Sequence, residues 1–216
     1  MQLKSILFKN ILGNNYKIVF HNSILNILSI FVDLITSMCY NDLIKLYGGS
    51  MYILGIDPGF AIVGWGIVEV NRGKIRPVAY GAITTPAHTN IEARLLMIQN
   101  DIEAIINKYH PDEMAVEELF FNTNITTGIA VAEARGVIIC TAHKLGVKIS
   151  EYTPLQVKQA VVGYGKAEKQ QVIAMVTTLL KLSKPPKPDD TADALAIAIC
   201  HSQCAGSAMG KYFNQR

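Results

Sequence analysis

The chain has 216 residues, a formal net charge of +3 at pH 7, and 50% hydrophobic residues. This length suits one compact domain with an appendage, and the hydrophobic content is enough for a sizeable core. The net charge is too small to indicate a nucleic-acid partner by itself. The four cysteines, Cys39, Cys140, Cys200 and Cys204, are scattered and form no Cys-x-x-Cys pair, which favours reduced thiols of a cytoplasmic protein over a disulfide framework.

The first fifty residues differ in composition from the rest of the chain. They contain no Ala, Pro, Arg, Glu or Trp, and they are rich in Ile and Asn. We interpret residues 1–50 as an amino-terminal extension, either translated upstream sequence or a dispensable addition, with Met51 as the functional start. An accessory helix and a membrane segment are the alternatives. The apolar residues 24–38 contain Asp33 and are fewer than the roughly 20 that a membrane span needs, so no membrane association is expected.

An antiparallel meander is predicted to open the sheet. Residues 52–56 predict a buried strand that ends at the turn Asp57-Pro58-Gly59. Further strands are predicted at residues 62–70 and 75–84, joined by a turn around Asn71-Arg72-Gly73. Strands joined by such short turns pair antiparallel.

Helices alternate with strands after the meander. Thr89-Asn-Ile-Glu92 has the pattern of a capping box, and it predicts the start of an amphipathic helix that Pro111 ends. This order predicts an α/β fold with a mixed central sheet flanked by helices, followed by a loose tail at residues 206–216. The remaining strands are predicted at residues 114–116 and 147–152, and the remaining helices at residues 126–145, 157–162, 167–180 and after Pro188.

Four carboxylates stand at the ends of apolar segments, where burial does not favour a bare charge. Asp57 follows the first strand and Glu117 follows the strand at 114–116. Asp190 and Asp193 begin the last, apolar helix, and their spacing of three residues places them on one helix face. Ionised carboxylates are costly to bury unless they are paired or bind a metal. A cluster of oxygen ligands suits Mg²⁺ or Mn²⁺ and phosphodiester cleavage.

Each acid also has an ordinary structural interpretation. Asp57 would form an Asx-turn, and Glu117 would be an exposed edge residue. Asp189 and Asp190 would cap the last helix and complement its dipole. Capping does not explain Asp193, which lies one turn inside an apolar helix. The joint pattern therefore favours a metal site, and water activated by the metal is the expected attacking group, since no Ser or Cys has a base partner in a local motif.

Residues 158–187 form a basic stretch, with six lysines and one acid, Glu168. Such a stretch is typical of contact with phosphates. An ordinary solvated helix face has the same composition.

Four segments form an ordered set of motifs: Ile-Leu-Gly-Ile-Asp57-Pro-Gly, Ala-Val-Glu117-Glu-Leu-Phe120, Gln156-Val-Lys158-Gln-Ala-Val-Val-Gly163 and Ala192-Asp193-Ala-Leu-Ala-Ile-Ala. They resemble the RuvC family of bacterial crossover junction endodeoxyribonucleases, or Holliday junction resolvases. The resemblance covers nearly the whole of an expected nuclease domain at residues 51–205. It implies a ribonuclease H-like fold and a cytoplasmic, Mg²⁺-dependent homodimer that resolves four-way DNA junctions in homologous recombination and repair. The RuvA–RuvB branch-migration complex is the implied partner, and Mn²⁺ is expected to substitute for Mg²⁺.

On this resemblance, Asp57, Glu117, Asp190 and Asp193 are the metal-binding catalytic acids. Asp57 would bridge two ions, while Glu117 and the helix pair would each hold one ion or orient its water. A hydroxide on one ion would attack the phosphorus while the other ion stabilises the leaving 3′ oxygen, and paired symmetric nicks would result. Asp189 leaves the third acid ambiguous by one position, although the spacing of Asp190 from Asp193 fits better.

The same resemblance implies residues that contact DNA. Phe120 resembles the family's aromatic that stacks on or wedges into junction bases, with a core position as the alternative because Phe121 follows. Lys158 and Lys169 match the family's basic positions near the scissile phosphate, and Lys166 adds a positive charge in the same turn.

Three further alternatives stay open at the level of sequence. Arg135-Gly136 matches a family motif that DNA contact, packing and dimer contact would each explain. A nucleotide-binding module of the actin and sugar-kinase type also uses a strand-Asp-x-Gly loop, but it needs a duplicated domain with a second loop, and none follows here. A DNA-binding relative without activity would have lost an acid, and all four are present.

Overall fold

The computed structural model of the chain describes residues 49–119 and 125–204. Within these ranges the chain forms a five-stranded mixed sheet with the strand order β3-β2-β1-β4-β5. β2 pairs antiparallel with β1 and β3, whereas β1, β4 and β5 run parallel to one another. The strands are β1 (Met51–Asp57), β2 (Ile62–Asn71), β3 (Lys74–Thr84), β4 (Glu113–Glu117) and β5 (Lys148–Tyr152).

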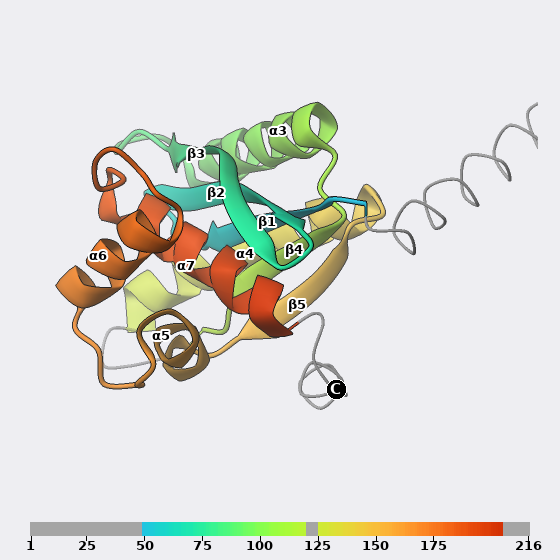
Figure 1. Ribbon diagram of the computed structural model, residues 1–216. Helices are drawn as coiled ribbons and strands as arrows, with labels where there is room; N and C mark the ends of the chain where they lie inside the picture. Colours follow the sequence, from blue (N-terminus) through green and yellow to red (C-terminus); the bar gives the residue numbers. More distant parts are fainter. Residues whose placement is uncertain (1–48, 120–124, 205–216) are drawn as a thin grey trace, which may run out of the picture. The chain divides into compact units, whose positions relative to one another are not determined.

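Helices cover both faces of this sheet (Figure 1). α5, α6 and α7 share one hydrophobic core with one face, and α3 and α4 share another core with the opposite face. Side chains alternate along β1 accordingly, because Ile53 belongs to the first core and Leu54 to the second. The helices are α3 (Ile91–Tyr109), α4 (Ile125–Lys144), α5 (Pro154–Val162), α6 (Lys169–Leu179) and α7 (Asp189–Cys204).

The predicted mixed sheet, its opening meander and the order of the elements are confirmed. One local prediction is wrong. α3 starts after Asn90, whose side chain makes no capping hydrogen bond, so Thr89 does not begin a capping box. A complete capping box opens α5 instead, where the side chains of Thr153 and Gln156 bind each other's backbone N–H groups.

Most predictions for the two ends of the chain concern residues that the structure does not describe. Residues 1–48 and 205–216 are not described, so the extension and the tail stay predictions. No described helix combines the length and the hydropathy that crossing a membrane requires.

α7 approaches the sheet closely because β1 and β2 present glycines to it. A Cβ atom at Gly55 would lie 2.1 Å from the carbonyl oxygen of Ala194. A Cβ atom at Gly64 would lie 1.9 Å from the carbonyl oxygen of Asp190. The absence of a side chain at these two glycines therefore allows the short distance between α7 and the strands.

Gly55→Ala is expected to lower the free energy of unfolding by about 1–3 kcal/mol, because the new methyl group meets helix backbone that cannot move aside locally. Gly136→Ala on α4 is the matched control. A Cβ atom there meets nothing within 4 Å, and Ala favours a helix over Gly by about 0.5–1 kcal/mol. Urea unfolding followed by circular dichroism measures both variants, and equal stability of Gly55→Ala and wild type would contradict the close packing.

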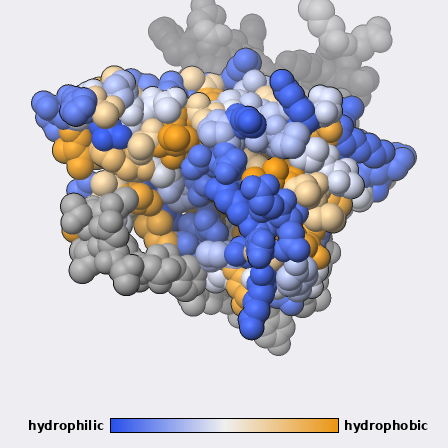
Figure 2. Space-filling model, turned by 90° about the vertical axis from the view of Figure 1, so that its left-hand side faces the viewer, coloured by the Kyte–Doolittle hydropathy of each residue, from blue (hydrophilic) through white to orange (hydrophobic). Residues whose placement is uncertain are grey.

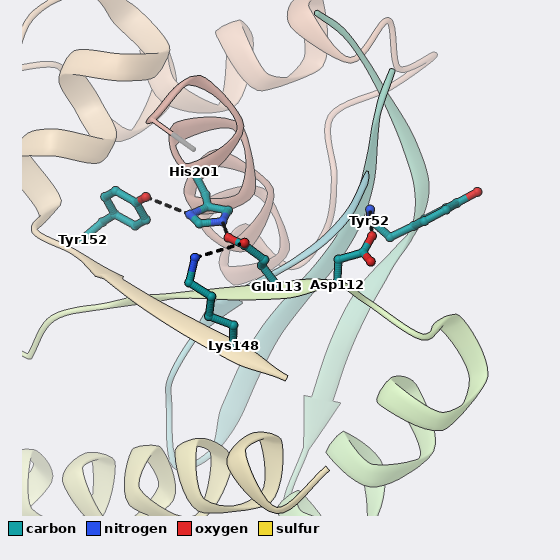
Figure 3. Close-up of polar contacts among 6 residues, drawn as sticks. All are labelled: Tyr52, Asp112, Glu113, Lys148, Tyr152 and His201. Carbon is teal, nitrogen blue, oxygen red and sulfur yellow. Dashed lines mark hydrogen bonds and ion pairs between the residues drawn. The ribbon is translucent and has the colours of Figure 1, made fainter. Parts of the chain in front are cut away.

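A buried polar network fixes the carboxyl-terminal part of α7 (Figure 3). His201, which is 1% exposed, is hydrogen-bonded through Nδ1 to the Tyr152 hydroxyl (2.8 Å) and through Nε2 to Oε2 of Glu113 (2.6 Å). Lys148 Nζ lies 3.2 Å from Oε1 of the same carboxylate. The hydrogen bond from His201 holds the pKa of Glu113 below its ordinary value. This tie to β4 and β5, about three helical turns from Asp190, limits sliding of α7 along its axis.

Candidate active site

Two of the predicted acids end neighbouring parallel strands. Asp57 is the last residue of β1, and Glu117 is the last residue of β4. The register that pairs Ile56 with Val116 makes them neighbours across strands that lie about 4.8 Å apart. Ala115 packs in the core beneath α7, so alternation along β4 directs the Glu117 side chain to the same face. Both carboxylates are therefore directed toward α7.

The first two turns of α7 bring the other two acids over this end of the sheet. The carbonyl oxygen of Asp190 lies against Gly64, which pairs with Asp57 in the β1–β2 ladder. Asp193 follows one turn later on the same helix face, with its side chain 29% exposed. The fold thus gathers all four predicted acids, which the sequence distributes over three elements.

Burial, together with repulsion between the acids, raises the pKa values of three of them. Burial, and then the charges of Asp193, Glu117 and Asp190, raise the pKa of Asp57 from 3.8 to about 8. Burial and the charge of Asp193 raise the pKa of Glu117 from 4.5 to about 7. Burial is also the main cause that raises the pKa of Asp193. Without a cation, part of the cluster is therefore protonated at neutral pH.

Lys169, the first residue of α6, supplies a positive charge to this cluster. Its Nζ lies 3.0 Å from Oδ2 of Asp193 and 3.9 Å from Oδ2 of Asp189. Burial alone would lower the pKa of Lys169, but the hydrogen bond to Asp193 and the neighbouring negative charges raise it. The sequence predicts Lys169 near a phosphate but does not predict its ion pair with Asp193. Spacing along the chain does not show that the start of α6 contacts the start of α7.

The carboxylate oxygens of the four acids are suitable ligands for a divalent cation. All four donate carboxylate oxygens, the ligands that Mg²⁺ and Mn²⁺ prefer. Burial and the neighbouring negative charges raise the pKa values of Asp57, Glu117 and Asp193, so these carboxylates lie within electrostatic reach of other acids of the site. Among residues 49–119 and 125–204, no three His, Cys, Asp or Glu side chains are close enough together to coordinate one ion. A cation at this site would therefore have to draw the carboxylates inward.

The exposed acid Asp189 is less suited to the site than Asp190. The Asp189 side chain is 58% exposed and lies at the far limit of an ion pair with Lys169. Asp190 is half-buried, and its charge contributes to the raised pKa of Asp57. These observations favour the spacing that the sequence predicted.

The structure describes three of the four predicted DNA-contact residues, the lysines. Lys158 on α5 is half-buried, and its charge lowers the pKa of Glu117, so it lies near the acids. Lys166 is exposed between α5 and α6. Phe120 lies outside the described residues. Figure 2 looks onto the side where α5 and α6 lie in Figure 1, and a band of hydrophilic residues runs across it with hydrophobic patches alongside.

Arg135 is the residue whose role the sequence left open. Its Nε donates a hydrogen bond to the backbone carbonyl of Glu117, and its guanidinium forms an ion pair with Glu151. The Arg-Gly motif could draw attention to Arg135, but only the packing of α4 against the sheet shows which groups it contacts.

Comparison with known proteins agrees with this geometry. The family described as crossover junction endodeoxyribonuclease RuvC matches residues 53–201. The chain is 57% identical over 152 residues to the protein of that name from Clostridioides difficile, a match that covers 70% of this chain and 90% of the relative. It is 59% identical over 157 residues to the one from Heliobacterium modesticaldum, which covers 73% of this chain and 95% of the relative.

Solved structures give the same result. The structure of Thermus thermophilus RuvC superposes with a TM-score of 0.67 at 35% identity, covering 72% of this chain and 95% of that chain. The T. thermophilus protein in complex with a Holliday junction substrate superposes with a TM-score of 0.70 at 34% identity, covering 74% of this chain and 97% of that chain. The predicted ribonuclease H-like fold is confirmed by these neighbours. The chain belongs to the RuvC family of crossover junction endodeoxyribonucleases.

Proposed function

We propose that the chain resolves four-way DNA junctions by paired symmetric nicks in recombination and repair. The observation that carries the proposal is the convergence of Asp57, Glu117, Asp190 and Asp193 at one end of the sheet. The likeness to a RuvC protein bound to a Holliday junction supplies the substrate class. Four carboxylates that lie close together repel one another, and cations bound beside a phosphodiester would offset that repulsion.

The four acids would hold two Mg²⁺ ions, with Mn²⁺ as a substitute. When bound, such ions neutralise the charge that develops on the phosphate and lower the pKa of water. Asp57 is the central ligand in this proposal, because the charges of Asp193, Glu117 and Asp190 all act on it. The chain's own task is to hold these carboxylates at one end of the sheet, where bound cations can draw them together.

Lys169 would change partners when the site fills. Its ammonium now neutralises Asp193 at 3.0 Å. A cation bound at Asp193 removes that attraction, and the freed ammonium can then bind a phosphate oxygen of the strand. Lys158 and Lys166 would bind neighbouring phosphates, and Phe120 would stack on a junction base.

Paired nicks require two active sites. A two-fold homodimer would place one site on each of two equivalent strands of the junction. This homodimer would act in the cytoplasm, with the RuvA–RuvB complex as its partner.

The affinity for Mg²⁺ is expected to rise between pH 6 and pH 8.5, because the cation must displace protons from Asp57 and Glu117, whose pKa values are about 8 and about 7. Without a cation, stability has the opposite trend. The folded state holds a proton on Asp57 that the unfolded chain has released, so the free energy of unfolding falls as pH rises from 3.8 to about 8. Calorimetric Mg²⁺ titrations and urea unfolding at a series of pH values test both trends, and a flat Mg²⁺ affinity would contradict them.

The proposed function is tested by incubating the full chain with a labelled four-way junction and, separately, with a linear duplex of the same sequence. Symmetric nicks are expected in the junction with Mg²⁺ or Mn²⁺, and none are expected in EDTA or in the linear duplex. A chain that begins at Met51 is expected to cut at the same rate. Equal cutting of junction and duplex would contradict the proposal.

A further inference from the structure

Arg135 joins three elements at the edge of the proposed site. Its Nε donates a hydrogen bond to the backbone carbonyl oxygen of Glu117 at 3.2 Å. Its Nη2 lies 2.7 Å from Oε2 of Glu151. The Arg135 side chain is only 16% exposed, so α4, β4 and β5 are held together by a largely buried guanidinium.

Arg135 reaches Glu117 from the side opposite to the acids. α4 packs in the core that contains Met114 and Val116. The Glu117 side chain lies on the opposite face of β4, because side chains alternate along a strand, and it is directed toward α7. Arg135 therefore binds the main chain of Glu117 from behind. Its contacts are to a carbonyl oxygen and to Glu151, and neither is a reacting group.

The carbonyl contact occurs where β4 ends. The last regular link to β5 is the hydrogen bond from the Glu118 N–H to the carbonyl of Tyr152, at 2.8 Å. Residues 118 and 119 belong to no strand, so the ladder no longer restrains the backbone there. Glu117 stands at this boundary, and Arg135 provides an additional restraint there. An arginine suits the position because its planar guanidinium donates hydrogen bonds to two acceptors at once. A lysine ammonium can bind two acceptors too, but with less fixed geometry.

We propose that Arg135 is a positioning residue, which fixes the main chain of Glu117 so that its carboxylate stays beside Asp57 and can reach a cation bound there. This inference rests on the proposed function of the acids as a cation site. Glu151 holds the guanidinium in the orientation in which Nε meets the Glu117 carbonyl. Contact with DNA and contact with a second subunit are the other roles that an arginine can have here, and each predicts a different result below.

The test compares Arg135→Gln, Arg135→Lys and Glu151→Gln in the full chain, with Arg72→Gln as a control that removes an exposed arginine in the turn between β2 and β3. The first readout is Mn²⁺ binding without DNA, followed by electron paramagnetic resonance. The second is the Mg²⁺ concentration that gives half-maximal junction cleavage. The third is junction affinity in Ca²⁺.

Arg135→Gln is expected to weaken Mn²⁺ binding and to raise the half-maximal Mg²⁺ concentration, each by about 10-fold, because a charge-assisted hydrogen bond is lost. Junction affinity is expected to change by less than about 3-fold. Arg135→Lys should recover part of the loss through a single hydrogen bond. Glu151→Gln keeps an oxygen acceptor but loses the ion pair that orients Arg135, so it should weaken Mn²⁺ binding in the same direction and by less than Arg135→Gln does. Arg72→Gln should stay within about 3-fold of wild type.

Three results would overturn the proposal. Lost junction affinity with unchanged Mn²⁺ binding would assign Arg135 to DNA contact. A shift from dimer to monomer in light scattering with unchanged Mn²⁺ binding would assign it to a subunit interface. Wild-type values in every readout would leave it no role at the site. Circular dichroism confirms that each variant is folded at the assay temperature, and Arg135→Lys keeps the test decisive if Arg135→Gln unfolds. Failure of wild type to cut junctions would instead refute the proposed function, and Mn²⁺ binding would still test Arg135.

Discussion

Asp57→Asn is expected to abolish junction cleavage, with a loss of at least about 10³-fold, or about 4 kcal/mol of transition-state stabilisation. The amide keeps the size of the side chain and removes the charge that all three other acids act upon. Junction binding is expected to persist, because the lysines around the site supply the attraction to phosphates. Rate measurements on a labelled junction and affinity measurements in Ca²⁺ separate the two effects.

The same variant should be more stable than wild type in the absence of a cation. Wild-type Asp57 is buried among like charges, and an amide relieves that repulsion above neutral pH. Asp101→Asn, an exposed acid on α3, serves as the control and should change neither cleavage nor stability. An active Asp57→Asn protein, or one that no longer binds junctions, would contradict the assignment of Asp57 as a metal ligand.

Asp190→Asn and Asp189→Asn are expected to differ in their effects on cleavage. Asp190 is half-buried and acts on Asp57, so its loss should reduce the cleavage rate by about 100-fold or more, the effect of about 2.7 kcal/mol. Asp189 is 58% exposed and lies 3.9 Å from the Lys169 ammonium, the far limit of an ion pair, so its loss should cost less than about 3-fold. Steady-state cleavage at saturating Mg²⁺ measures both variants.

The neighbouring positions make this pair a matched comparison, because both substitutions remove one negative charge from the first turn of α7. Any effect on the helix dipole is therefore shared. The reverse order of effects would move the third acid to Asp189. Equal and small effects would reduce the site to Asp57, Glu117 and Asp193.

The fold and the positions of the acids could largely be predicted from the sequence. Asp57 and Glu117 end short apolar strands, and the carboxyl ends of parallel strands meet at one edge of a sheet. The apolar helix after Pro188 marks Asp193 as unusual, because neither capping nor solvent explains an acid one turn inside it. The fold prediction is confirmed because strand and helix patterns are local, whereas the metal-binding role of the acids stays a prediction.

Predictions that depend on side-chain geometry were less successful. Thr89 and Thr153 both precede a plausible helix start, yet only Thr153 forms a capping box, because the exact residue at which a helix begins depends on how it packs. The ion pair between Lys169 and Asp193 needs α6 to lie against α7, which no spacing along the chain specifies. The contact of Arg135 with the Glu117 carbonyl is similarly a product of tertiary packing.

The most direct test of the metal site is a crystal of the full chain soaked with Mn²⁺ and measured at a wavelength where manganese scatters anomalously. The predicted result is an anomalous peak within coordination distance, about 2.0–2.3 Å, of carboxylate oxygens from Asp57 and at least one other acid of the site, with Lys169 withdrawn from Asp193. A crystal of Asp57→Asn should lack that peak. Manganese bound elsewhere, with Lys169 still paired to Asp193 and the acids unoccupied, would contradict the account.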